Sequence, residues 1–132
     1  MTIGEAATAS GVSAKMIRHY EAIGLIEPAA RSASGYRVYS ERDIHTLRFI
    51  RRARDLGFAV EQIRSLLALW RDEARASSDV KRIALEHVEA LQAKMRTLQT
   101  MADALLHLAQ TCHGDKRPDC PILEELGSAD PR

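Results

Sequence analysis

The sequence predicts a mainly α-helical chain with a small N-terminal unit, one long helix, and a short C-terminal loop and helix. Three observations lead to this prediction. Short segments with helical spacing of apolar residues fill the first half of the chain. A heptad pattern free of Gly and Pro fills most of the second half. The only two cysteines, Cys112 and Cys120, then enclose a segment whose Gly and Pro residues oppose helix.

Charge is distributed unevenly along the 132 residues. Residues 1–54 hold nine Lys or Arg and five acidic residues, whereas residues 55–132 hold ten and thirteen. A basic first half and an acidic, helical second half fit a nucleic-acid binder with a separate assembly or sensing part. The longest apolar run, Leu66 to Trp70, is too short to cross a bilayer, and no signal peptide is evident. We therefore expect a cytoplasmic protein with no membrane partner and with reduced cysteines.

The first two helices are expected at residues 3–9 and 14–23, with Ser13 as the N-cap of the second. A tight turn joins them, which is the arrangement of a helix-turn-helix whose second helix enters a DNA major groove. Lys15 and Arg18 lie three residues apart and so share a face of this recognition helix. Two solvated charges on an ordinary small helix are the alternative interpretation.

Residues 31–39 contain a Ser-Gly turn signal followed by alternating Tyr, Arg, Val and Tyr. This pattern predicts a small β-hairpin, or wing, with a basic and aromatic outer face. Such side chains can bind phosphates and fix the register of a protein on duplex DNA. We expect Tyr39 to pack against the helices instead. The candidate wing contacts are Arg31, Tyr36 and Arg37.

Two more helices complete the N-terminal domain. Ser40 to Asp43 resembles a capping box with Asp in place of Glu or Gln, and it predicts a helix that ends near Gly57. Apolar residues recur at helical spacing from about Ala59 to Trp70. Residues 1–70 are therefore expected to form the DNA-binding domain, and the polar stretch 71–78 is a candidate hinge.

Residues 79–111 are expected to form one long helix of about 50 Å, at 1.5 Å per residue. Its apolar positions alternate in steps of four and three residues, and they are Ala84, Val88, Leu91, Met95, Leu98, Ala102, Leu105 and Ala109. An isolated helix would leave this seam in water, so a homodimer is expected. Packing onto the chain's own first domain is the alternative, but that domain is too small to cover such a length.

The last segment, 112–132, is a candidate metal-binding loop followed by a short helix beginning at Pro121. Two soft thiolates, from Cys112 and Cys120, suit a soft monovalent ion such as Cu(I) better than a hard cation. Zn(II) prefers four ligands. A disulfide is the alternative use of the pair, and His113 is an optional third ligand. The chain shows no nucleophile–base pair and no Cys-x-x-Cys motif, so an enzyme is not expected.

Taken together, these features resemble the MerR family of bacterial transcription regulators, over essentially the whole chain. The most specific stretches are Arg18 to Ile26, Gly35 to Tyr39, and Ala53 to Phe58. Within that family the C-terminal segment resembles the copper(I)-responsive branch, the copper-efflux regulators of the CueR and HmrR kind. The resemblance implies that Cys112 and Cys120 hold one Cu(I) in nearly linear coordination.

The resemblance also assigns a role to Ser77. The copper branch carries Ser immediately before the long helix, where relatives that sense divalent ions have a third cysteine. Ser77 and Cys112 flank the long helix at opposite ends, so they can meet only between antiparallel subunits, as in the family's dimers. The implied DNA contacts on the recognition helix are Lys15, Arg18, His19 and Tyr20, and His19 replaces the Phe or Tyr usual in the family.

The resemblance implies a homodimeric activator of copper-efflux genes that binds a pseudo-palindromic promoter. When metal is bound, the dimer distorts the DNA so that RNA polymerase engages both promoter elements, an example of indirect readout. Ag(I) and Au(I) share the charge and softness of Cu(I) and remain alternative effectors. A thiol–disulfide redox-responsive regulator is a further alternative.

Overall fold

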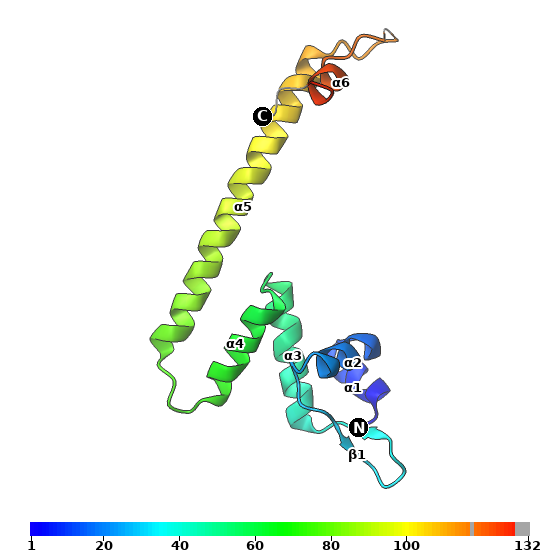
Figure 1. Cartoon of the computed structure of the whole chain (residues 1–132), viewed down its shortest axis with the longest axis vertical. Helices are drawn as coiled ribbons and strands as arrows, with labels where there is room; N and C mark the ends of the chain where they lie inside the picture. Colours follow the sequence, from blue (N-terminus) through cyan, green and yellow to red (C-terminus); the bar gives the residue numbers. More distant parts are fainter. Residues whose placement is uncertain (117, 129–132) are drawn as a thin grey trace. The chain divides into compact units, whose positions relative to one another are not determined.

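The computed structural model describes residues 1–116 and 118–128 of the chain. The chain divides into two compact units, Met1–Val80 and Lys81–Arg132, each described below by itself. Figure 1 shows the elements in chain order. They are α1 (Ile3–Ser10), α2 (Ala14–Ala22), β1 (Ala30–Arg31), β2 (Arg37–Val38), α3 (Glu41–Asp55), α4 (Val60–Arg71), α5 (Ser77–Thr111) and α6 (Pro121–Leu126). The prediction of a mainly helical fold with an N-terminal helix-turn-helix and a long later helix is confirmed.

The helix-turn-helix forms because its two helices have well-defined ends. Thr2 and Glu5 make a capping box at the start of α1. The Ser13 hydroxyl accepts a hydrogen bond from the Met16 N–H at 3.2 Å, so the predicted N-cap of α2 is confirmed. Gly11, in the turn between them, has φ +76°, and a Cβ there would overlap the guanidinium of Arg51. Only glycine fits that turn without displacing the arginine.

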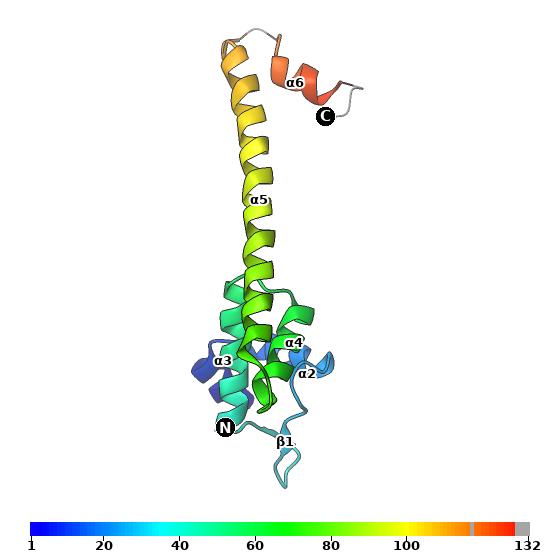
Figure 2. The ribbon, with the colours of Figure 1, turned by 90° about the vertical axis from the view of Figure 1, so that its left-hand side faces the viewer.

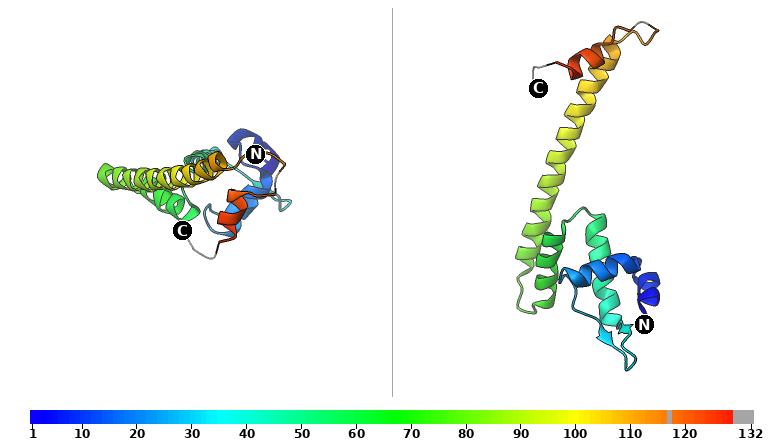
Figure 3. Two further views of the ribbon diagram at one scale, coloured as in Figure 1. Left: turned by 90° about the horizontal axis from the view of Figure 1, so that it is seen from above. Right: turned by 45° about the vertical axis from the view of Figure 1, so that its right-hand side comes forward.

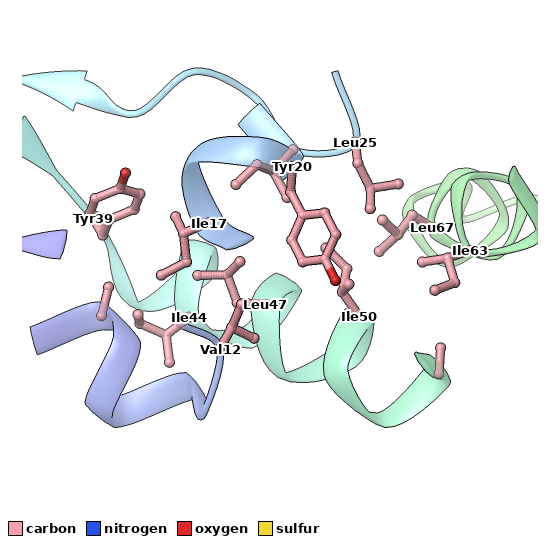
Figure 4. Close-up of a cluster of buried hydrophobic side chains, with 13 residues drawn as sticks. Val12, Ile17, Tyr20, Leu25, Tyr39, Ile44, Leu47, Ile50, Ile63 and Leu67 are labelled. Carbon is pink, nitrogen blue, oxygen red and sulfur yellow. The ribbon is translucent and has the colours of Figure 1, made fainter. Parts of the chain in front are cut away.

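The first unit encloses one apolar core. Ile17 of α2, Leu47 and Ile50 of α3, and Ile63 of α4 are its largest fully buried side chains. Figure 4 shows these residues converging from the helices that surround the core. Tyr39, which follows the wing, is 2% exposed, as predicted. The inner face of the recognition helix α2 is therefore packed against this core.

The wing is a two-stranded antiparallel hairpin. Ala30 pairs with Val38, and Arg31 pairs with Arg37. The Ser32 N–H donates to the Tyr36 carbonyl oxygen at 2.8 Å and closes the turn. Both views of Figure 3 include this hairpin, and the right-hand view shows it extending beyond the helices of the first unit.

Helices α3 and α4 form close to the positions that the sequence predicts. The Ser40 hydroxyl accepts from the Asp43 N–H at 3.2 Å, while the Asp43 carboxylate accepts from the Ser40 N–H at 2.8 Å. The capping box with Asp is therefore confirmed. The rings of Phe49 on α3 and Trp70 on α4 stack with centroids 4.9 Å apart and planes 7° from parallel. This pair joins the C-terminal part of α4 to α3.

The second unit contains most of α5, a loop, and α6. Helix α5 begins at Ser77, inside the range suggested as a hinge. In the single chain its heptad side chains are exposed, among them Val88, Leu91, Met95, Leu98 and Leu105. Figure 2 shows the chain leaving the end of α5, turning, and entering α6. Within the described residues, no helix has the length and apolar character needed to traverse a bilayer.

Candidate metal centre and DNA-binding surface

The two cysteines lie at the junctions of a turn between helices. Cys112 directly follows α5, and its N–H donates to the carbonyl oxygens of Leu108 and Ala109 at 3.2 and 3.3 Å. Gly114 has φ +67° and turns the chain back. Cys120 is the N-cap of α6, and Pro121 is the first helical residue. The local sequence thus places one thiol at a helix C-terminus and the other at a helix N-terminus.

The structure brings the two sulfur atoms together. The pKa of the Cys120 thiol lies below its usual value, first because the backbone N–H of Leu123 faces the sulfur. The N–H of Ile122 and a hydrogen bond from the Cys112 thiol lower the pKa further, whereas desolvation and the charge of Glu124 raise it. Both cysteines are free thiols and half-buried. The thiolate is the form that binds metal ions, and this arrangement favours it.

The surroundings of the pair contain few competing ligands. Among residues 1–116 and 118–128, no group of three or more His, Cys, Asp or Glu side chains is placed to hold a metal ion. His113 is exposed in the loop. Cys112 and Cys120 are therefore the two soft donors that this part of the chain brings together.

Ser77 is the first residue of α5 and belongs to the first unit, whereas the cysteine pair belongs to the second. The meeting of Ser77 with Cys112 across an antiparallel dimer stays a prediction.

The DNA-binding candidates gather on one part of the first unit. Lys15, Arg18 and His19 of α2 are exposed. Arg18 shares a surface hollow of about 260 Å³ with four wing residues, and the hollow is lined by Thr2, Ile3, Arg18, Arg31, Gly35, Tyr36 and Arg37. The fold therefore brings cations from the recognition helix and the wing, which are distant in sequence, to the same place.

One predicted contact is wrong. Tyr20 was expected to reach DNA from the recognition helix, but it is 5% exposed and belongs to the apolar core. Figure 4 shows its ring among the buried side chains. Tyr20 lies three residues after the fully buried Ile17, so both residues share the inner face of α2. That spacing was the available sequence signal, and it assigns Tyr20 to support of the helix.

Sequence reasoning missed Glu21, which links the recognition helix to the wing. Its Oε2 accepts from Arg37 Nε at 3.1 Å, and its Oε1 accepts from Tyr39 Oη at 3.2 Å and from the Ala29 N–H at 3.0 Å. Burial and then the charge of Glu21 raise the pKa of Tyr39. The sequence signal was an acidic residue at the end of an otherwise basic helix. Arg37 thus has a structural role in addition to any contact with phosphate.

Comparison with known proteins identifies the family. Residues 1–69 match the family described as MerR HTH family regulatory protein. Residues 44–108 match the family described as MerR, DNA binding. Together the two matches cover the first unit and most of α5.

Several regulators are similar over nearly the full chain. The HTH-type transcriptional regulator HmrR of Sinorhizobium medicae is 67% identical over 126 residues, which are 96% of this chain and 86% of that protein. Heavy metal-dependent transcription regulator 2 of Rhizobium meliloti is 64% identical, covering 97% and 87%. The regulator CueR of Salmonella typhimurium is 41% identical, covering 96% and 91%.

A solved structure shows the same fold. The transcription regulator PbrR691 from Ralstonia metallidurans CH34, in complex with lead(II), has a TM-score of 0.84 and 30% identity, covering 96% of this chain and 98% of that chain. These similar proteins are transcriptional regulators and not enzymes, and regulators of this kind bind promoter DNA as dimers. The chain belongs to the MerR family of helix-turn-helix transcriptional regulators.

Proposed function

We propose that this regulator is a cytoplasmic homodimer that responds to Cu(I) and activates copper-efflux and copper-homeostasis genes. The observation that carries the proposal is the pair of neighbouring thiols, with Cys120 at the N-terminus of α6 and its pKa lowered there. Each chain would supply Cys112 and Cys120 as the ligands of one ion.

The chemistry of the pair favours a monovalent soft ion. Cu(I) is stable with two thiolates, whereas Zn(II) prefers four ligands in a tetrahedron. Two thiolates with one Cu(I) carry a net charge of −1. The N–H groups of Ile122 and Leu123, which already face the Cys120 sulfur, offset part of that charge. The site thus provides what a bis-thiolate Cu(I) complex needs without a third anionic ligand.

Ser77 would strengthen this selectivity. In an antiparallel dimer the start of one α5 lies beside the end of the partner's α5, so Ser77 would lie near the partner's cysteine pair. A hydroxyl there does not add the third thiolate that a divalent soft ion prefers. Ag(I) and Au(I) have the same charge and softness as Cu(I), and they are the alternative effectors.

The exposed seam of α5 supports the dimer. Leu98 and Met95 near the middle of the helix are 63% and 67% exposed in the single chain. Apolar side chains at this spacing are covered when a second copy packs along the seam.

Promoter binding would use the side chains of α2 and the wing described above. Lys15, Arg18 and His19 would enter the major groove, while Arg31, Tyr36 and Arg37 of the wing would contact the backbone. The two ends of the dimer would distort the promoter between them and so present both promoter elements to RNA polymerase. Such distortion costs a few kcal/mol, which protein–DNA contacts offset.

A metal competition under strict reduction tests the proposal. The full-length protein is titrated against a chelator of known Cu(I) affinity, with Ag(I) and Zn(II) as competing ions. We expect one Cu(I) per chain, displacement by Ag(I), and no displacement by equimolar Zn(II). Tighter binding of Zn(II) than of Cu(I) would overturn the assignment of the metal.

A redox-responsive regulator is the second candidate, because the Cys112 thiol already hydrogen-bonds to Cys120. A disulfide between them would then be the signal. Oxidation of metal-free protein should activate transcription in vitro if this candidate is correct. Under the metal proposal, Cu(I) activates the fully reduced protein and oxidation does not.

A further inference from the structure

Arg64 of α4 is hydrogen-bonded to the end of the recognition helix. Its Nη1 donates to the Gly24 carbonyl oxygen and its Nη2 to the Ile23 carbonyl oxygen, both at 3.0 Å. The bonded residues are separated by 40 and 41 positions in the sequence. One guanidinium group therefore joins the end of α2 to a helix far along the chain.

The two carbonyl groups are suited to a cation. They follow the last turn of α2, where the helix dipole places partial negative charge. Gly24 has φ +72° and ends the helix in the left-handed conformation. The planar fork of arginine can donate to two adjacent oxygens at once, whereas the ammonium group of lysine has no such fork.

Two further contacts support the attachment of the end of α2 to α4. The Glu61 carboxylate lies 3.4 Å from Arg64 Nε and holds the guanidinium from its other side. Leu25, next to the clamped carbonyls, is buried in the same core as Leu67 of α4, and Figure 4 shows the two side chains pointing toward one another. The end of α2 is thus attached to α4 by a polar clamp and an apolar contact.

We propose that Arg64 is a positioning residue for DNA recognition. By fixing the C-terminal end of α2 to α4, it sets the orientation in which Lys15 and Arg18 meet the major groove. Helix α4 is also the last helix before α5, so the clamp connects the recognition helix to the element that leads into the dimerisation segment. The inference rests on the DNA-binding part of the proposed function and not on the identity of the metal.

A direct contact with phosphate is the competing role, because the Arg64 side chain is 40% exposed. The two roles differ in their effect on DNA binding. Loss of a phosphate contact weakens binding to all sequences and reduces the salt slope by about 1. Loss of a positioning residue weakens binding to the specific site and leaves non-specific binding and the salt slope unchanged.

The test uses a specific duplex selected from random DNA by the wild-type chain, and a scrambled duplex of equal length. Arg64→Ala and Arg64→Lys are compared with Arg96→Ala, which removes the same charge from an exposed position of α5. Affinity for both duplexes is measured without metal over a range of salt concentrations. Thermal melting and the fluorescence of the single tryptophan, Trp70, check that each variant keeps the fold.

We expect Arg64→Ala to lose about threefold to tenfold in affinity for the specific duplex only, on the scale of one ordinary hydrogen bond. Arg64→Lys should recover part of that loss, and Arg96→Ala should resemble wild type. Equal loss on both duplexes with a reduced salt slope would overturn the proposal, as would unchanged specific affinity in a folded variant. If Arg64→Ala melts at a lower temperature than wild type, the Arg64→Lys variant provides the test. Wild-type discrimination between the specific and scrambled duplexes in Arg64→Lys would overturn the proposal. A wild-type chain that selects no duplex would defeat the proposed function itself, before Arg64 is tested.

Discussion

Glu21 and Arg37 connect the recognition helix to the wing, with Arg37 Nε 3.1 Å from Glu21 Oε2. The Glu21 side chain is 11% exposed, so this ion pair is shielded from solvent on one side. The same carboxylate accepts from Tyr39 and from the backbone of Ala29, which precedes β1. One carboxylate therefore ties the recognition helix to the wing.

Glu21→Gln should loosen the wing relative to α2. We expect promoter affinity to fall by about threefold to tenfold, since a neutral amide replaces a charged acceptor of three hydrogen bonds. The pKa of Tyr39 should fall toward its usual value of 10.0, because the nearby negative charge contributes to its rise. Gel-shift binding and tyrosinate absorbance measure the two effects. Glu86→Gln, which breaks the exposed pair with Arg82, is the matched control, and an equal effect there would contradict this role.

Cys112→Ser and Cys120→Ser should separate metal sensing from DNA binding. Each variant retains one soft donor, so Cu(I) affinity should fall by at least about 100-fold and the transcriptional response should disappear. Dimerisation and metal-free DNA binding should be nearly unchanged, because the recognition helix belongs to the other unit of the chain.

The measurements are gel-shift binding, in vitro transcription and thermal melting, each with and without Cu(I). A variant that loses stability yet still responds to copper would speak for a structural disulfide instead.

Cys120 should ionise at a lower pH in the folded protein than in the unfolded chain. The N–H groups at the start of α6 favour its thiolate, so the pKa lies below the usual 9.0. The rate of iodoacetamide alkylation at Cys120, followed by mass spectrometry against pH, should show this lower midpoint. The same cysteine in urea-unfolded protein is the control. Because the folded-state pKa is the lower one, ionisation of Cys120 stabilises the folded state at pH values above the unfolded pKa. This stabilisation is lost as the pH falls through the folded pKa.

Ser77→Cys should admit divalent ions by adding a third thiolate in the dimer. We expect Zn(II) or Hg(II) to activate transcription in this variant and not in wild type. Ser78→Cys, one residue further along α5, is the matched control because it points from a different side of the helix. A response confined to monovalent ions in the Ser77 variant would show that ligand number does not set selectivity.

Arg18→Ala should weaken promoter binding equally with and without metal, because under the proposed function the recognition helix contacts DNA in both states. We expect the salt slope to fall by about 1 if Arg18 contacts a phosphate, and discrimination among base pairs to fall if it contacts a base. Fluorescence anisotropy over a salt series measures both quantities. Unchanged affinity would remove Arg18 from the DNA-binding surface.

Local patterns in the sequence determined the helical elements of this protein. Ser13, the capping box at Ser40, and the heptads of α5 each act over a few residues, so their effect can be read directly from spacing. The cysteine loop is equally local, since Gly and Pro residues force the turn that brings Cys112 and Cys120 together.

Tertiary structure decided which residues of α2 are buried and how the helix is held in place. Tyr20 is buried because the inner face of α2 packs into the core, and in a nine-residue helix its spacing from Ile17 is the main sequence sign of that orientation. Glu21 and Arg64 act through hydrogen bonds to residues 8 to 41 positions away. Such partners are chosen by the folding of distant segments against one another, and neither helical nor strand periodicity carries that information.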